Sequence, residues 1–125
     1  MARILLIDDD PAVRKVVRRM LEGAGHEFLE ASDGEAGMRL LAEHRPDLVI
    51  TDLFMPEQDG IVTVRRIRKE FPDVRVIVVS GGDSAGRLDL RRDAEVLGAI
   101  ASLRKPFASA DLLRTITEVL ALPAK

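Results

Sequence analysis

Carboxylate, hydroxyl and ammonium side chains follow four short apolar runs of this sequence. The run "RILLI" leads into Asp8 and Asp9, and the run "DLVIT" leads into Asp52. Farther along the chain, "VIVV" is followed by Ser80, and "IASL" is followed, after Arg104, by Lys105. Clustered carboxylates need a cation, and a set of oxygen ligands without histidine or cysteine favours a hard one, Mg²⁺ above all. A hydroxyl and an ammonium beside such a metal would suit a phosphoryl group.

Phosphoryl transfer to a carboxylate is the chemistry that these side chains could perform together. The metal and Lys105 would neutralise the equatorial oxygens of the phosphoryl group, while Ser80 would donate a hydrogen bond to it. Asp52 would then be the nucleophile and would become an acyl phosphate. Catalysis of this kind consists of positioning and charge stabilisation, so it requires these residues to converge in space.

Each of these residues also has an ordinary structural explanation. Asp8 and Asp9 could form a turn or a cap, and Asp52 could initiate the turn that follows it. Ser80 precedes two glycines and could be a loop hydroxyl, while Lys105 could be a solvated side chain. Their joint occurrence, each after an apolar run, favours the functional interpretation.

Convergence depends on the elements that carry these residues. Short runs rich in Ile, Val and Leu, with little polar alternation, are typical of strands buried on both faces of a sheet. Amphipathic helical patterns lie between the runs, so a strand followed by a helix occurs five times. This (βα)5 alternation predicts an α/β fold in which helices cover both faces of a parallel, doubly wound sheet. The predicted strands cover residues 4–7, 28–31, 48–50, 74–79 and 100–103.

Capping and turn residues predict where the helices begin and end. Asp10 suits an N-cap and Pro11 a first helical residue, while Gly23 suits the exit of the same helix. A second helix should follow Asp33 and stop before Pro46. The apolar stripe of the first helix consists of Val13, Val16, Val17, Met20 and Leu21. Further helices are expected after residues 59–60, over about 87–97, and from Ser109, which could cap the last one.

Bulk composition limits the classes of protein to which the chain can belong. Its 125 residues are 46% hydrophobic and 32% charged, which is ordinary for one globular domain. The net charge of −2 gives no general attraction to nucleic acid or to an anionic membrane. The absence of cysteine excludes disulfides and zinc–thiolate sites, and we expect a cytoplasmic protein.

The chain resembles the receiver domain of a bacterial two-component response regulator, in particular the single-domain chemotaxis type. The resemblance covers essentially all 125 residues and rests on "ILLIDDDP", "DLVITDLFMPEQDG", "VIVVSGG" and "LRKPF" in this order and spacing. It implies a flavodoxin-like sheet with strand order 2-1-3-4-5. It also implies one receiver domain over residues 1–125, without an output domain in this chain.

By position, the resemblance implies that Asp52 accepts phosphate from a partner phosphohistidine, on a sensor kinase or a histidine phosphotransfer protein. Asp9 would bind Mg²⁺ directly and Asp8 mainly through water, with Asp52 and the backbone carbonyl of Phe54 as further ligands. The activity would be limited to the domain's own phosphoryl transfer and autodephosphorylation, so we expect a signalling protein and not an enzyme with turnover.

The remaining implied residues would contact the phosphoryl group or shape its surroundings. Ser80 and Lys105 would touch the phosphoryl oxygens, and the peptide bond before Pro106 would be cis. Phosphorylation would change the face formed by the fourth helix, fifth strand and fifth helix, to which an unknown downstream protein would bind.

Two departures from the family pattern bear on this readout. Ser102 stands where many receivers have an aromatic residue that moves on activation, so we expect the loop after Ser80 and the fourth helix to carry most of the change. The predicted fifth strand has the apolar residues Ile100 and Ala101 where DNA-binding receivers often have acidic residues. We therefore expect no direct contact with nucleic acid and none with membrane.

Two other classes of function fit parts of the pattern. A Mg²⁺-dependent phosphatase with an aspartyl nucleophile needs a second Asp two residues later as general acid, but this position is Phe54. A degenerate receiver that only binds a partner would not need the intact set of site residues. A dinucleotide-binding loop is excluded because the first strand leads into aspartates and not into a glycine-rich turn.

Overall fold

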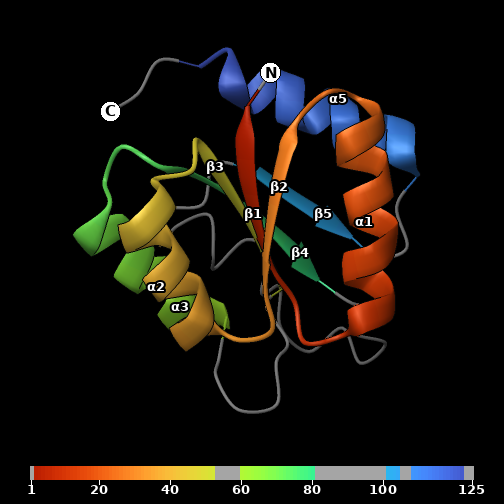
Figure 1. The fold of residues 1–125 in the computed structure, drawn as a ribbon. Coiled ribbons are helices and arrows are strands. Elements are labelled where there is room, and N and C mark those ends of the chain that lie inside the picture. Colours follow the sequence, from red (N-terminus) through yellow and green to blue (C-terminus); the bar gives the residue numbers. More distant parts are fainter. Residues whose placement is uncertain (1, 53–59, 81–100, 105–107, 123–125) are drawn as a thin grey trace.

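The computed structural model describes residues 2–52, 60–80, 101–104 and 108–122, and Figure 1 shows their arrangement. Strands and helices alternate over residues 3–80, as the sequence predicts, and a strand is again followed by a helix over residues 101–120. The expected helix over about 87–97 lies outside these residues. In the described part, no helix is long and apolar enough to cross a membrane. The elements are β1 (Arg3–Ile7), α1 (Pro11–Gly23), β2 (Glu27–Ala31), α2 (Gly34–His44), β3 (Leu48–Asp52), α3 (Gly60–Glu70), β4 (Arg75–Ser80), β5 (Ala101–Arg104) and α5 (Ser109–Leu120).

The five strands form one parallel sheet in the order β2-β1-β3-β4-β5, which confirms the order expected from the resemblance. Ile7 pairs with Thr51, and Thr51 in turn pairs with Val78. This register brings the carboxyl ends of β1, β3 and β4 to the same edge of the sheet. Residues that follow these strands therefore start close together in space, although they are far apart in the sequence.

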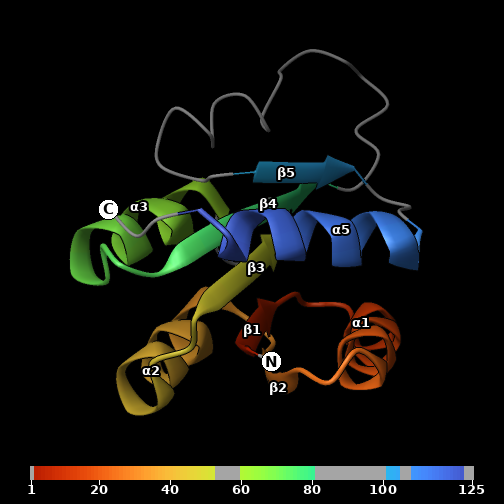
Figure 2. The ribbon, with the colours of Figure 1, turned by 90° about the horizontal axis from the view of Figure 1, so that it is seen from above.

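The core is divided by the sheet into two layers. Figures 1 and 2 show α2 and α3 on one face of the sheet, and α1 and α5 on the other. Because successive strand residues point to opposite faces, Leu5 and Ile7 face α2, while Ile4 and Leu6 face α1. The first layer includes Met38, Leu41, Val49, Val64, Ile67 and Val76, and the second includes Val17, Leu21, Leu48, Ile50, Ile77, Leu112 and Ile116.

Two expectations about burial and one about capping were wrong. β2 is not buried on both faces: it lies at the edge of the sheet, and its Glu27 and Glu30 are exposed. Val16 is 50% exposed because α1 packs only one side against the sheet, so the apolar stripe is narrower than predicted. The last helix is preceded by Ala108, which makes no side-chain cap bond, and Ser109 is its first residue.

Gly37 lets α2 approach β1 closely. An ideal Cβ at this position would clash with Cδ1 of Ile7 and would lie 2.8 Å from its Cγ1. Ile7 is fully buried and cannot move without disturbing the layer around it. We predict that Gly37→Ala lowers the free energy of unfolding by about 1–3 kcal/mol, measured by urea denaturation.

Gly23, the last residue of α1, provides the control for this prediction. A Cβ added there has no atom within 4 Å. Gly23→Ala should leave stability unchanged or raise it by up to about 1 kcal/mol, because alanine loses less conformational entropy on folding. Equal unfolding midpoints for the two variants would show that the contact with Ile7 does not limit the distance between α2 and β1.

His26 links the start of the chain to the α1–β2 connection in a pH-dependent way. The backbone N–H of Ala2 donates to Nδ1 of His26 at 3.1 Å, which requires a neutral imidazole. Burial lowers the pKa of His26 below its usual 6.5. The unfolded chain therefore binds the proton first, and this contribution to stability is present above about pH 6.5 and is lost as the pH falls through the folded pKa.

The measurement is urea unfolding at about pH 7.5 and about pH 5.5, on either side of the ordinary histidine pKa. Wild type should lose more stability over this interval than His26→Asn, because asparagine retains an acceptor but does not titrate. An identical loss in both proteins would mean that the bond from Ala2 does not depend on the charge of His26.

Candidate functional site

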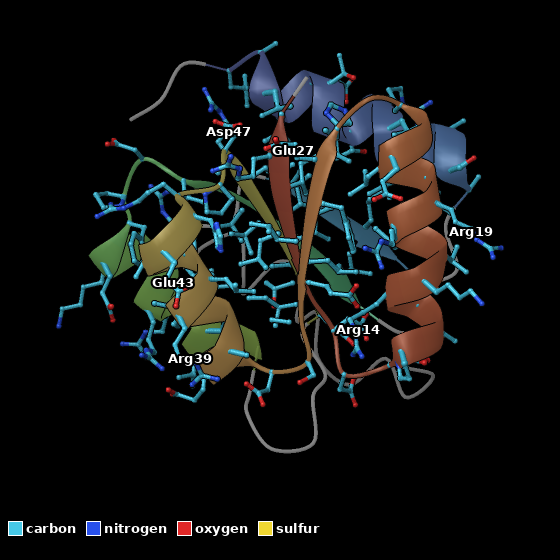
Figure 3. The ribbon with its side chains drawn as sticks, in the orientation of Figure 1. Arg14, Arg19, Glu27, Arg39, Glu43 and Asp47 are labelled. Carbon is cyan, nitrogen blue, oxygen red and sulfur yellow. The ribbon has the colours of Figure 1, made fainter. Side chains whose placement is uncertain are left out.

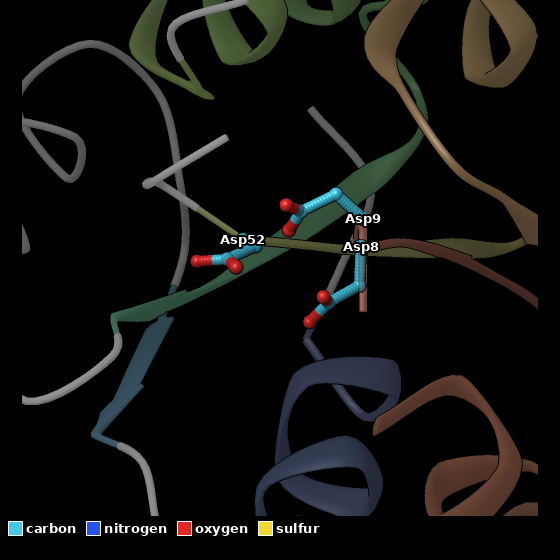
Figure 4. A group of neighbouring side chains, drawn as sticks. All are labelled: Asp8, Asp9 and Asp52. Atoms are coloured by element: carbon cyan, nitrogen blue, oxygen red, sulfur yellow. The ribbon is translucent and has the colours of Figure 1, made fainter. Parts of the chain in front are cut away.

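Three carboxylates meet at the carboxyl edge of the sheet. Asp8 and Asp9 follow β1, and Asp52 is the last residue of β3. One carboxylate oxygen from each lies within 4.8 Å of the others. Figure 4 shows the three side chains as neighbours at the ends of two adjacent strands. The structure thus brings together three of the residues that the sequence predicts to form the site.

The three carboxylates differ in their exposure to solvent. Asp8 is 1% exposed and Asp52 is 5% exposed, whereas Asp9 lies at the surface. Burial strengthens the repulsion between like charges, because water screens them less than at the surface. The site therefore combines two buried carboxylates with one at the surface, where a cation can approach from solvent.

The backbone and side chain of Asp8 are held by several hydrogen bonds. Its N–H donates to the carbonyl of Ala31 on β2 at 3.1 Å. Its Oδ1 accepts from the N–H of Asp10 at 2.9 Å, and its carbonyl accepts from Nη1 of Arg14 at 2.7 Å. These contacts fix the turn that leads from β1 into α1.

Asp10 has a different role from its two neighbours. Its backbone is extended, and its Oδ1 accepts from the N–H of Ala12 at 2.9 Å, with Pro11 as the first helical residue. This confirms the prediction that Asp10 is the N-cap of α1. Its side chain accepts a hydrogen bond from the first turn of α1, and its backbone N–H donates to Oδ1 of Asp8.

The donor set agrees with a small, hard cation. Mg²⁺ binds oxygen ligands at about 2.0–2.1 Å, so two ligand oxygens on opposite sides are separated by about 4.2 Å. The 4.8 Å spread of the three carboxylates is slightly wider than this span and would close with small side-chain rotations. Asp8, Asp9 and Asp52 therefore fit a Mg²⁺ ion by chemistry and by size.

The other predicted site residues are described only in part. Ser80 is the last residue of β4, and its preceding neighbour Val79 pairs with Asp52 in the sheet. Its backbone therefore lies at the same edge as the carboxylates. Phe54, Lys105 and Pro106 lie outside the described residues, although β5 ends at residue 104, directly before Lys105.

Two residues beside the site were missed from the sequence. Arg14 donates Nη1 to the carbonyl of Asp8, and its Nε lies 2.8 Å from Oε1 of Glu30. Neither residue belongs to a sequence motif, and a charged residue on a helix or an edge strand is usually solvated. One signal could have found them: Arg14 lies one turn inside α1, beside the apolar position Val13, where a long side chain can reach the strand ends.

Comparison with known proteins identifies relatives of this chain. The family model described as "Response regulator receiver domain" matches residues 4–117. "Response regulator MprA" from Mycobacterium sp. (strain KMS) is 38% identical over 118 residues, which cover 94% of this chain and 50% of MprA. MprA from Mycobacterium leprae is 37% identical over the same shares. The chain thus spans about half the length of these relatives.

Solved structures show the same fold. A response regulator receiver domain protein from Clostridium thermocellum superposes with a TM-score of 0.88 at 34% identity, covering 96% of this chain and 94% of that one. The chemotaxis protein CheY4 of Vibrio cholerae gives a TM-score of 0.85 at 27% identity, covering 95% and 98%. The receiver domain of NtrX from Brucella abortus gives 0.89 at 26%, covering 96% and 99%.

The division of the aspartate triplet can be tested by mutation. Asp10→Ala should lower the free energy of unfolding by about 1 kcal/mol, because it removes the cap of α1. It should leave Mg²⁺ binding intact, since the bond from the backbone N–H of residue 10 to Asp8 does not need the side chain. Asp9→Ala should abolish Mg²⁺ binding, measured by amide shifts in NMR titrations. Equal loss of Mg²⁺ binding in both variants would contradict this division.

Proposed function

This chain belongs to the response regulator receiver family, which acts in phosphorylation-dependent two-component signalling, and we propose that Asp52 is its phosphoacceptor. The donor is a phosphohistidine on a partner sensor kinase or histidine phosphotransfer protein. The observation that carries this proposal is the approach of Asp8, Asp9 and Asp52 to within 4.8 Å at the carboxyl edge of the sheet. We further propose that residues 1–125 form a single receiver domain that acts in the cytoplasm.

The proposed step exchanges one bond to phosphorus for another. A carboxylate oxygen of Asp52 attacks the phosphorus, and the P–N bond to the donor histidine breaks. The bonding pair stays on the leaving nitrogen, and the imidazole leaves neutral because its other ring nitrogen already carries a proton. The product is an acyl phosphate on Asp52. Water later attacks the same phosphorus, the bond to the carboxylate oxygen breaks, and inorganic phosphate is released; this is the autodephosphorylation expected of this chain.

The residues of the chain supply position and charge. Burial of Asp52 fixes the nucleophile at the end of β3, where Thr51 is fully buried and donates its hydroxyl to the carbonyl of Asp52 at 3.3 Å. Asp8 and Asp9 would hold the cation, with Asp52 and the carbonyl of Phe54 as the other protein ligands. Mg²⁺ bound there would neutralise charge on the phosphoryl oxygens during transfer.

Ser80 and Lys105 complete the proposed site from the β4 and β5 ends. Ser80 donates its hydroxyl to a phosphoryl oxygen, and Lys105 contributes a positive charge. Ser80 is the last residue of β4, and the residue before it, Val79, pairs with Asp52; this position supports the assignment. Their contacts to the phosphoryl group bias the segment after Ser80 and the face around β5 and α5 between two states, to which a downstream protein responds.

The MprA relatives are about twice as long as the region that matches this chain. We propose that this receiver does not itself touch nucleic acid and that its output is a protein contact. The face around α5 is built on a helix whose inner side is anchored by Leu112, Ile116 and Val119. Its outer residues are therefore free to serve recognition without a cost to the core.

The test is incubation with acetyl phosphate and Mg²⁺, followed by intact mass measurement. Wild type should gain one phosphoryl group that hydroxylamine removes, as expected of an acyl phosphate. Asp52→Asn should gain none, because its amide is a poor nucleophile, and removal of Mg²⁺ with a chelator should abolish labelling of wild type.

A matched control is Asp47→Asn, which alters an exposed carboxylate that accepts from the backbone N–H of Arg3 at the other end of the sheet. It should be labelled like wild type. Full labelling of Asp52→Asn would contradict the assignment of Asp52 as the acceptor. Labelling without any divalent cation would contradict the metal site.

A further inference from the structure

Arg14 is held inward at the start of α1, beside the carboxylate site. Its side chain is 18% exposed, far less than that of Arg18 one turn later, at 53%. Figure 3 shows Arg14 lying between α1 and β2, whereas Arg19 points away from the domain. An arginine loses side-chain entropy when it is fixed in this way, so its contacts have to compensate for that cost.

The contacts of Arg14 use two different nitrogens of its guanidinium group. Nη1 donates to the carbonyl oxygen of Asp8 at 2.7 Å, and Nε donates to Oε1 of Glu30 at 2.8 Å. Charge-assisted bonds of this length are about twice as strong as neutral ones. Because the guanidinium group is planar and rigid, fixing one nitrogen on Glu30 also fixes the direction of the other.

The carbonyl of Asp8 belongs to the peptide unit that carries Asp9. Asp8 is anchored at its N–H by Ala31 and at its Oδ1 by the N–H of Asp10. Arg14 adds the bond to its carbonyl, so the peptide plane between Asp8 and Asp9 cannot rotate freely. The orientation of this plane determines the φ torsion of Asp9. It therefore influences the direction in which the exposed Asp9 side chain extends from the backbone.

We propose that Arg14 is a positioning residue for the divalent cation: by fixing the Asp8–Asp9 peptide it aims the carboxylate of Asp9 at Asp8 and Asp52. Glu30 is its support, since it holds the guanidinium group from the edge strand. The inference rests on the proposed function, because it assumes that these carboxylates bind Mg²⁺. It adds two residues on α1 and β2 to a site otherwise made from the ends of β1 and β3.

The charge of Arg14 allows this role to be separated from electrostatics. A positive charge close to a cation site opposes binding, so Coulomb interactions alone predict that removing it strengthens Mg²⁺ binding. Loss of the peptide clamp predicts the opposite sign. The neutral variant Arg14→Gln therefore distinguishes the two effects by direction and not only by size.

Arg18 is the matched control on the same helix. It reaches the same Glu30, but its Nη1 lies 3.5 Å from Oε2 and its side chain is half exposed. Arg18→Gln makes the same change in net charge without removing a contact to Asp8. Any long-range effect of charge on the cation site should therefore be present in this variant.

The experiment is NMR titration of the full chain with Mg²⁺ alone, following backbone amide shifts, since the chain has no Trp or Tyr to report by fluorescence. Arg14→Gln should raise the Kd for Mg²⁺ by about tenfold, the lower range for loss of a group that orients a metal ligand. Arg18→Gln should bind Mg²⁺ as tightly as wild type or slightly more tightly. Arg14→Lys, which keeps the charge but cannot span both oxygens, should weaken binding as well.

Urea unfolding of each variant without metal supplies the second readout. A lower unfolding midpoint for Arg14→Gln with an unchanged Kd would show a merely structural role and overturn the inference. Tighter binding by Arg14→Gln would do so too. If Arg14→Gln does not fold, Arg14→Lys decides the matter by the same two measurements. Failure of wild type to bind Mg²⁺ would instead refute the metal site itself, and the inference with it.

Discussion

The proposed site depends on three carboxylates being held close together at one edge of a parallel sheet. Asp8 and Asp52 are almost fully buried, so their repulsion is screened less than it would be at the surface. The register pairs Ile7 with Thr51, so the residues that follow them, Asp8 and Asp52, lie side by side. The stability of the two apolar layers maintains this arrangement, which a divalent cation and a phosphoryl group would use.

Much of the fold could be predicted because its signals are local. Runs of Ile, Val and Leu defined the strands to within two residues, and Asp10 and Asp33 marked the starts of α1 and α2, where each accepts a backbone N–H. The strand order came from the resemblance and not from these patterns. Periodicity gave no information on which strand lies at the edge, so the exposure of Glu27 and Glu30 was not anticipated.

The candidate site was predictable where it follows from chain direction. Carboxylates that follow parallel strands converge whatever the details of packing, and this brought Asp8, Asp9 and Asp52 together. Arg14 could not be found in this way, because its contacts join a helix to the backbone of one strand and the side chain of another. Such contacts depend on the exact distance between elements, which residue types and spacing leave open.

The β1 side of the site is held by contacts along the backbone and side chain of its first carboxylate. On the β1 side, Asp8 is held at its N–H, its carbonyl and its carboxylate, and Ile7 before it is pressed against Gly37 of α2. A phosphoryl group on Asp52 would therefore lie beside a rigid β1 side. Since the contacts that hold Asp8 involve neither the cation nor the phosphoryl group, both would meet a carboxylate that is already in position.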